Sequence, residues 1–424
     1  MPPGIRCNIY SLGVFMHKYI IEGGEELSGV IHVSGSKNAA LPVIFATIIT
    51  EGVSAIYGLP DILDVRIALE LLRGFGARIT HECNVTYIDT KRLYYVAPDP
   101  RLVGRLRAST YLIGACLARF GVAVVGGFGG CSFSDRPIDL HLYAMRSLGA
   151  YDLGDRLLAD KLSSAQIDFP IVSVGATVNA LIAAARAEGE SIISGASREP
   201  HIDTLIEFLR GAGAEINVEG STIRIRGTRP GGSTVHIPGD MIEAGTYLTI
   251  GALLGGRVGV EGISAIELHS FLSPLTEAGM RLETKEGALY LLGKCDVPVS
   301  ITTAPYPGFP TDLQPIAALL LAAFSGGTIK ESVWRDRFGY LKELNKMGLS
   351  YKLLPSAAEI YKSELSSAVV TSPDLRGGAA LVIAALLARG KSVILNAEML
   401  CRGYERLEDK LLSLGARVKF IETT

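Results

Sequence analysis

The chain lacks paired cysteines, an excess of basic charge and an apolar run long enough to cross a membrane. Its six cysteines are scattered over 424 residues and never form a CxxC pair, which argues against a disulfide framework or a zinc site and favours a reducing cytosol. The net charge of -2 and the pI near 6.4 give no basic field. We therefore expect neither nucleic acid nor an anionic membrane as a partner.

The first residues do not match a secretory signal. The segment Ile9 to Met16 is apolar and follows Arg6, but it is short, and neither a small-residue cleavage site nor an apolar span of about twenty residues follows it. We interpret residues 1 to about 15 as an extension, or as the result of a misplaced start codon with Met16 as the true start.

Length and composition are typical of a soluble globular protein with more than one domain. Hydrophobic residues make up 48% of the chain and charged residues 20%, as is usual for such proteins. A single core rarely organises 424 residues, so the length favours two or three domains.

A unit of more than 60 residues recurs six times along the chain. In each copy a leucine-rich stretch ends in a glycine and a β-rich run follows; the glycines are Gly76, Gly149, Gly213, Gly279, Gly348 and Gly415, spaced by 73, 64, 66, 69 and 67 residues. We expect each glycine to end a helix in the left-handed conformation. Solenoid repeats usually run from about 20 to 50 residues, so the longer period favours pseudo-symmetric globular domains over a solenoid.

A second helix, small and apolar on nearly every side, precedes the leucine-rich stretch in each copy; examples are VGATVNALIAAAR and RGGAALVIAALLA. Such helices are typical of a buried position. The unit is therefore strand, buried helix, strand, outer helix, strand, and six units grouped three and three predict two similar α/β domains. We expect the chain to cross between them near 34–36 and 235–239, which gives a discontinuous domain of residues 1–36 plus 239–424 and a second of residues 37–238.

Polar residues stand at or near the starts of these buried helices, where a core would not select them. They are Lys37, Asn38, Arg107, Ser173, Glu243, Asp312 and Arg376. Free N–H groups and the helix dipole make such termini anion sites, and a neighbouring cation strengthens them. Each one alone could be a surface charge or a structural ion pair, but their recurrence at equivalent places indicates a substrate with phosphates or carboxylates.

The stretch FGGCSFSDRPIDLH places Cys131 on a glycine-rich segment that we interpret as a mobile loop. A thiol there, with Arg136 near, can have a lowered pKa and reach a ligand, although an inert cysteine is the alternative. Cys116, inside an apolar helix, is predicted to be core.

Three further polar residues have structural explanations. Asp312 follows a Pro-Thr turn at a helix start, where aspartate is a common cap. His141 and His201 have no metal partners at ligand spacing, so we interpret them as structural.

Nine segments resemble, in order, the signature segments of the UDP-N-acetylglucosamine 1-carboxyvinyltransferases, a branch of the enolpyruvyl transferase family. They are SGSKNAALP, LRAS, GGCSFSDRPIDLH, VSVGATV, SREPHIDT, APYPGFPTDLQ, RFGYLKEL, PDLRGGAAL and RGYERLEDKL, and the resemblance covers the chain from about Ile20 to its C-terminus. It implies an inside-out α/β barrel of two three-unit domains, in agreement with the repeat count.

The resemblance also implies residue roles. Lys37, with Asn38 beside it, Arg136 and Arg402 match residues that bind phosphoenolpyruvate, Cys131 matches a proton donor that can carry a covalent adduct of the donor substrate, and Asp312 matches the base for the sugar 3-hydroxyl. The positions that match the lining of the UDP-sugar site are Arg107, Arg136, Pro137, Ile138, Asp139, Leu140, Val172, Ser173, Val174 and Val333. The polar cleft is completed by Arg337, Asp374 and Arg376.

The implied activity is transfer of the enolpyruvyl group of phosphoenolpyruvate to the 3-hydroxyl of UDP-N-acetylglucosamine in the cytosol, the first committed step of peptidoglycan synthesis, with no metal or organic cofactor. Two positions depart from the family pattern: Tyr111 replaces a frequent indole, and Ile171 replaces a frequent lysine. Three alternatives stay open: 5-enolpyruvylshikimate-3-phosphate synthase, a paralogue for another nucleotide sugar, and a silent binding protein. The presence of Lys37, Cys131 and Asp312 argues against the last.

Overall fold

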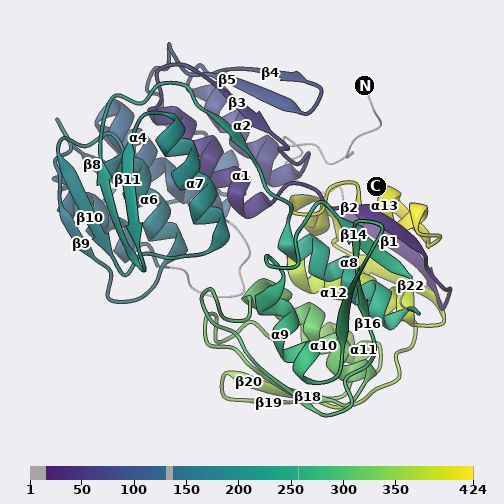
Figure 1. Ribbon diagram of the computed structural model, residues 1–424. Coiled ribbons are helices and arrows are strands. Elements are labelled where there is room, and N and C mark those ends of the chain that lie inside the picture. The colour runs from purple at the N-terminus through teal and green to yellow at the C-terminus, as the bar shows by residue number, and fades with distance from the viewer. Residues whose placement is uncertain (1–15, 130–136, 256, 424) are drawn as a thin grey trace.

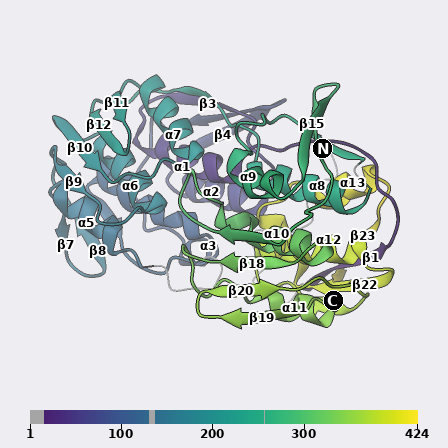
Figure 2. The ribbon, with the colours of Figure 1, turned by 60° about the horizontal axis from the view of Figure 1, so that its bottom comes forward.

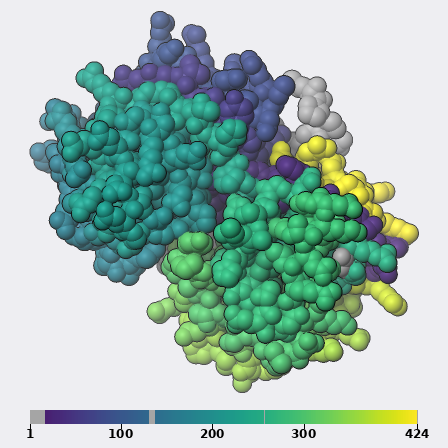
Figure 3. Space-filling view, in the orientation of Figure 1, coloured from purple at the N-terminus to yellow at the C-terminus, as the bar shows by residue number. Residues whose placement is uncertain are grey.

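The structure is a computed structural model that describes residues 16–129, 137–255 and 257–423. Two groups of helices, each flanked by sheets, form two halves of the molecule that meet near β2 and α1 (Figure 1). The surface is hollowed on one side where the teal half meets the light-green part of the other (Figure 3). The predicted buried and outer helices both occur in all six units.

The six inner helices are almost entirely apolar and lie within the halves. They are α1 (Lys37–Ala46), α4 (Leu112–Phe120), α6 (Val174–Ala184), α8 (Met241–Leu253), α10 (Gln314–Ala323) and α12 (Leu375–Leu387). In α12 every residue from Leu375 to Leu386 is buried. Small residues such as alanine let these helices approach one another closely. A helix that is apolar on every side has no polar face for solvent and is therefore buried.

The six outer helices each bury one face. They are α2 (Leu63–Gly74), α5 (Asp139–Ser147), α7 (Pro200–Gly211), α9 (His269–Glu277), α11 (Tyr340–Lys346) and α13 (Leu407–Ser413); a single turn, α3 (Pro100–Val103), lies between units. The repeated glycine that follows each of them has φ between +92° and +114°. This confirms the predicted left-handed helix ends, since a side chain would strain that conformation.

Five four-stranded sheets and one three-stranded sheet surround the helices in the described part of the chain. In the first half, with neighbouring strands named in turn, one sheet is β13 (Thr234–His236), β3 (Val53–Tyr57), β5 (Val85–Asp89) and β4 (Arg78–Glu82); the next is β6 (Val122–Val124), β8 (Arg156–Leu158) and β7 (Tyr151–Asp152); and the third is β11 (Glu215–Glu219), β12 (Thr222–Arg226), β10 (Glu190–Ser194) and β9 (Gln166–Asp168). In the second half, one sheet is β15 (Arg281–Lys285), β16 (Ala288–Leu292), β14 (Val258–Glu261) and β2 (Gly29–His32); the next is β17 (Val299–Thr302), β18 (Gly327–Lys330), β20 (Ala357–Ile360) and β19 (Tyr351–Leu354); and the third is β21 (Val369–Thr371), β22 (Gly390–Leu395), β1 (Met16–Gly23) and β23 (Arg417–Thr423). Figure 2 shows β18, β20 and β19 side by side along one edge.

The chain exchanges one strand in each direction between the halves. Strand β2 precedes α1 but pairs in parallel with β14, and β13 precedes α8 but pairs in parallel with β3. The two crossing segments touch in a bridge between Gly35 and Gly239. Strand β1 lies between β22 and β23, purple among yellow and green in Figure 1. The first strand therefore completes the last sheet.

Buried residues form two hydrophobic clusters. One is drawn from Ala39 to Ile237 together with Cys401, and the other from Tyr19 to Val33 and from Ile242 to Val418. Cys116 is buried in the first cluster, as predicted for a core cysteine.

Candidate functional site

Asp312 lies between two arginines at the start of an inner helix. It belongs to the short turn η3 (Thr311–Leu313) before α10. Arg337 Nη1 donates to Asp312 Oδ1 at 2.8 Å, and Arg376 Nε donates to Asp312 Oδ2 at 3.1 Å. Both arginines are buried, whereas the Asp312 side chain is 28% exposed. No side chain caps η3 or α10, so Asp312 is not the helix cap that its position could also have indicated.

Asp374 and Tyr404 fix the position of Arg376. Asp374 Oδ1 accepts from the backbone N–H groups of Arg376 and Gly377, at 2.9 and 3.0 Å, and so caps α12. The Arg376 guanidinium lies 5.5 Å from the centroid of the Tyr404 ring, a cation–π distance. Asp374 is therefore the N-cap of the helix that carries Arg376.

Lys37 and Arg402 share a second carboxylate, Asp64, which the sequence analysis did not select. Lys37 Nζ lies 3.4 Å from Asp64 Oδ2, and Arg402 Nε donates to Asp64 Oδ1 at 2.9 Å. Lys37 is the first residue of α1, Asp64 lies in the first turn of α2, and Arg402 ends the turn η4 (Ala397–Arg402). An aspartate near a helix start reads from sequence as an ordinary first-turn residue, so no local signal distinguished Asp64.

Opposing effects set the pKa values of this cluster. Burial alone would raise the pKa of Asp312, but the charges of Arg337, Arg376 and Lys37 outweigh it and hold that pKa far below its usual range. Burial lowers the pKa of Lys37, and the charges of Arg376 and Arg402 lower it too, against Asp64 and Asp312. The structure thus brings together five predicted residues: Lys37, Asp312, Arg337, Arg376 and Arg402.

Glu331 is a second residue that the sequence analysis missed. It is fully buried. One oxygen accepts from Thr303 Oγ1 at 2.6 Å and from the backbone N–H groups of Val333 and Trp334 at 2.9 Å, and the other from Thr311 Oγ1 at 2.9 Å. It therefore ties the Val333 turn to the turn that carries Asp312. Hydrogen bonds to a charged oxygen of this kind are among the stronger ones in proteins.

The predicted nucleotide-sugar residues of the first half lie at neighbouring helix starts. Arg107 begins the turn η2 (Arg107–Tyr111), Asp139 begins α5, and Ser173 caps α6 by accepting from the N–H of Ala176 at 3.3 Å. Contacts join α5 to α6 and α6 to η2. The remaining members of this set, which flank those helix starts, are Pro137, Ile138, Leu140, Val172 and Val174.

The two departures from the family pattern differ in exposure. The Ile171 side chain is 68% exposed, so a cation at that position would reach solvent or a ligand freely. Tyr111 packs edge-on against Phe45, with ring centroids 6.1 Å apart, as expected of an aromatic packing residue. Asn38 is partly exposed next to Lys37 on α1.

The two histidines differ in their surroundings. His141 is buried and its Nδ1 is 2.7 Å from Asn179 Nδ2, which agrees with a structural role, and burial lowers its pKa to about 4. Burial lowers the pKa of His201 to about 4, and the negative charge of the nearby Asp312 carboxylate opposes this lowering. Near it, Glu199 Oε1 accepts from the N–H of Tyr306 at 3.0 Å. The SREPHIDT segment of the first half therefore contacts the segment that leads to Asp312.

Cys131 and Arg136 lie outside the described residues. Within residues 16–129, 137–255 and 257–423, no cluster of three or more His, Cys, Asp or Glu side chains could hold a metal ion. No helix in those same ranges has both the length and the apolar character needed to cross a membrane.

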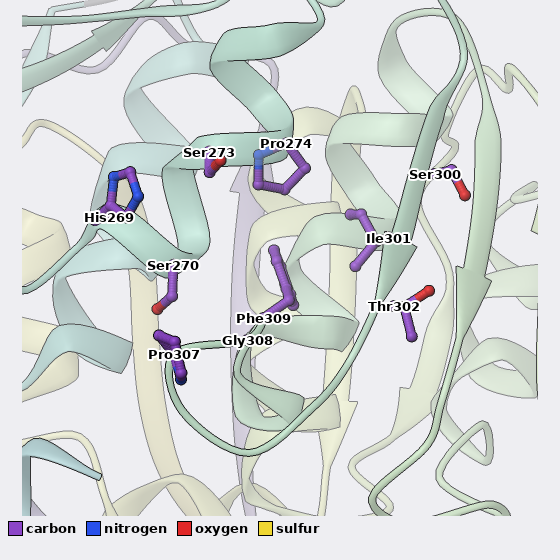
Figure 4. Close-up of a pocket in the computed structure, with 10 residues that line it drawn as sticks. All are labelled: His269, Ser270, Ser273, Pro274, Ser300, Ile301, Thr302, Pro307, Gly308 and Phe309. Carbon is purple, nitrogen blue, oxygen red and sulfur yellow. The ribbon is translucent and has the colours of Figure 1, made fainter. Parts of the chain in front are cut away.

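A cavity of about 260 Å³ opens on the second half, beside the segment that leads to Asp312. Figure 4 shows its lining residues, which come from α9, β17 and the following loop: His269, Ser270, Ser273, Pro274, Ser300, Ile301, Thr302, Pro307, Gly308 and Phe309. None of the predicted site residues lines it, and we assign it no part in the site.

Known proteins resemble the chain over nearly its whole length. The EPSP synthase (3-phosphoshikimate 1-carboxyvinyltransferase) family matches residues 21–411. UDP-N-acetylglucosamine 1-carboxyvinyltransferase 3 of Caldanaerobacter subterraneus subsp. tengcongensis is 39% identical over 412 residues, which are 95% of this chain and 99% of that one. The UDP-N-acetylglucosamine 1-carboxyvinyltransferase of Halothermothrix orenii is 40% identical over 415 residues, 96% and 100% of the two chains.

Solved structures share the fold. The enolpyruvyl transferase NikO from Streptomyces tendae is similar with a TM-score of 0.86 at 25% identity, over 97% of this chain and 100% of that one. An EPSP synthase from Acinetobacter baumannii gives a TM-score of 0.73 at 19% identity, over 96% and 100%, which is a likeness of fold alone. The predicted two-domain α/β fold is therefore confirmed.

Proposed function

The chain belongs to the EPSP synthase family, and within it to the UDP-N-acetylglucosamine 1-carboxyvinyltransferases, and from this premise we propose that it transfers the enolpyruvyl group of phosphoenolpyruvate to the 3-hydroxyl of UDP-N-acetylglucosamine. Phosphate is the second product. The reaction is the first committed step of peptidoglycan synthesis, and we place it in the cytosol.

One observation carries this proposal. Four cations, Lys37, Arg337, Arg376 and Arg402, surround two carboxylates where the two halves meet. Phosphoenolpyruvate is a compact anion with a phosphate and a carboxylate, and such a ligand needs several cations held in one place. We assign the binding of phosphoenolpyruvate to Lys37, Arg136 and Arg402, with Asn38 beside them.

The chemistry requires a proton to be added at one atom and removed at another. In the proposed path, Cys131 gives a proton to C3 of the donor while Asp312 takes the proton of the sugar hydroxyl, whose oxygen then bonds to C2. The tetrahedral intermediate loses phosphate from C2 and a proton from C3, which restores the double bond. The cations stabilise the charge of the phosphate as it leaves. No step of this path uses a metal or an organic cofactor.

The ion pairs of Asp312 place a condition on its role as base. Two arginines keep the carboxylate ionised, which is the form that accepts a proton, but they also weaken it as a base. A base is most effective when its pKa lies near the working pH. We therefore propose that bound substrates draw at least one of the two arginines, Arg337 or Arg376, toward their own anionic groups.

Substrate recognition involves both halves. We propose that residues 1–36 with 239–424 form one domain and residues 37–238 the other, and that the two domains close on the substrates. The nucleotide sugar is assigned to Arg107, Arg136 to Leu140, Val172 to Val174 and Val333. Glu331 supports Val333 through the backbone.

Phosphate release from phosphoenolpyruvate tests the proposal. We expect release with UDP-N-acetylglucosamine and none with shikimate 3-phosphate, the acceptor of the related synthase. Because Ile171 leaves an apolar, exposed side chain where a lysine is frequent in the family, other UDP-sugars form a third arm. Release with one of those alone would make the chain a paralogue with a different acceptor.

A further inference from the structure

Asp64 lies deeper in the molecule than the two cations that it joins. Its side chain is 3% exposed, compared with 14% for Lys37 and 12% for Arg402. The carboxylate therefore lies behind the cations, which keep the more accessible position.

The three residues come from both halves of the chain. Lys37 begins α1 and Asp64 lies in the first turn of α2, both in the first half, whereas Arg402 ends η4 of the second. A further contact joins the same segments, because the N–H of Asp61 donates to Glu405 Oε1 at 3.1 Å. The α2 start and the η4 region thus meet at a defined place.

The charges divide into two sets of one carboxylate and two cations. Asp312 pairs with Arg337 and Arg376, and Asp64 pairs with Lys37 and Arg402. Without Asp64, two like charges would face each other in a poorly solvated place, and their long side chains would regain many rotamers. A carboxylate behind them holds both charged groups at one spacing.

We propose that Asp64 is the positioning residue of the donor site, holding Lys37 and Arg402 together so that they bind the anionic groups of one donor molecule. This inference rests on the proposed function, since it assumes that the donor is an anion bound by these two cations. Asp64 itself touches no reacting atom. Its effect is expected on donor binding, through Lys37 and Arg402.

Asp64→Asn keeps the size of the side chain and removes its charge. We expect the KM for phosphoenolpyruvate to rise at least about tenfold, the loss of about one charge-assisted interaction, with a smaller change in the KM for the UDP-sugar. Binding of inorganic phosphate, measured by calorimetry, should weaken in parallel, and this readout does not depend on turnover.

The pH profile separates positioning from a general structural effect. The groups that face the Lys37 ammonium are Asp64, Arg376, Arg402 and Asp312. Removing the Asp64 charge takes away a contribution that raises the pKa of Lys37, so the alkaline limb of kcat/KM for the donor should move to lower pH in Asp64→Asn. Asp64→Glu retains the charge one methylene further out, so that limb should stay in place while the donor KM rises severalfold.

The matched control is Asp61→Asn. Asp61 lies three residues earlier and pairs with Arg66 in solvent, so both substrate KM values should match those of the wild type. If Asp64→Asn does not fold, the donor KM of Asp64→Glu and the affinity of that variant for inorganic phosphate test the inference. An unchanged donor KM and phosphate affinity in the folded Asp64 variants would overturn the inference. Absence of turnover in the wild type would instead overturn the proposed function, and phosphate binding would still test Asp64.

Discussion

At the scale of single residues, Asp312 is held by Arg337 and Arg376 in a way that a helix cap would not need. We expect Asp312→Ala to lower kcat by at least about 100-fold, the usual contribution of a general base, and to change the donor KM much less. Steady-state kinetics with both substrates varied measure this split.

The control for this variant is Asp336→Ala. Asp336 is exposed and stands beside Arg337 in the chain, so its loss should leave kcat near the wild-type value. Turnover of Asp312→Ala close to that of the wild type would leave Asp312 as a structural ion-pair partner of the two arginines and would require another base.

Ile171 offers a gain-of-function test, because its side chain is 68% exposed and packs little. Ile171→Lys adds a cation at the nucleotide end of the proposed site, so the KM for the UDP-sugar should fall while the donor KM stays nearly constant. Leu153→Lys adds the same charge at another exposed apolar position and should change neither value. An equal or higher KM in Ile171→Lys would mean that another residue already holds that phosphate.

At the scale of an element, the start of α12 carries Arg376 into the site. Asp374 is buried and accepts two backbone hydrogen bonds there. Asp374→Ala should lower the free energy of unfolding by about 1 kcal/mol, as for other lost helix caps. It should also lower kcat, because the backbone N–H of Arg376 loses the hydrogen bond that holds it in place. Thermal unfolding and kinetics measure the two effects.

Asp374→Asn separates the cap from the charge. Asparagine caps helices about as well as aspartate does, so most of the stability and activity should be retained. Equal losses of activity in the Asn and Ala variants would indicate instead that the carboxylate charge of Asp374 acts on a substrate, the role that family resemblance implies.

At the scale of the whole molecule, His141 makes stability depend on pH. Its pKa is about 4 in the folded protein, below the ordinary value of 6.5. Below pH 6.5 the unfolded chain binds a proton at His141, whereas the folded protein binds it only near pH 4. The free energy of unfolding therefore falls between about pH 6.5 and pH 4, by about 3 kcal/mol for this residue. Unfolding followed across that range should show the loss.

His141→Gln removes the titrating group and keeps an acceptor for Asn179. The variant should be less stable at pH 7 but should lose less stability between pH 6.5 and pH 4 than the wild type. His81→Gln, at an exposed position of β4, is the control. A pH dependence of His141→Gln equal to that of the wild type would show that His141 is not its source.

The sequence by itself determined the repeated unit. The six glycines and the six apolar helices are local signals, because a left-handed helix end needs glycine and a fully buried helix needs apolar residues on every side. The same is true of Lys37, Asp312 and Arg376, which stand at helix starts that the repeat makes equivalent. Residue type and position in the unit predicted an anion site at these helix starts, whereas the individual roles of Lys37 and Asp312 came from the family resemblance.

Only the tertiary structure decided which of these residues meet and what supports them. Asp64 joins Arg402 across 338 positions of sequence, and Glu331 reaches Thr303 across 28. A buried carboxylate is stable only where cations or hydrogen-bond donors pair with it, and the packing of distant segments decides whether such groups are present. The pairing of Asp64 with Arg402 therefore followed from how the two halves come together. The pairing of Glu331 with Thr303 and Thr311 followed from the packing of segments within the second half.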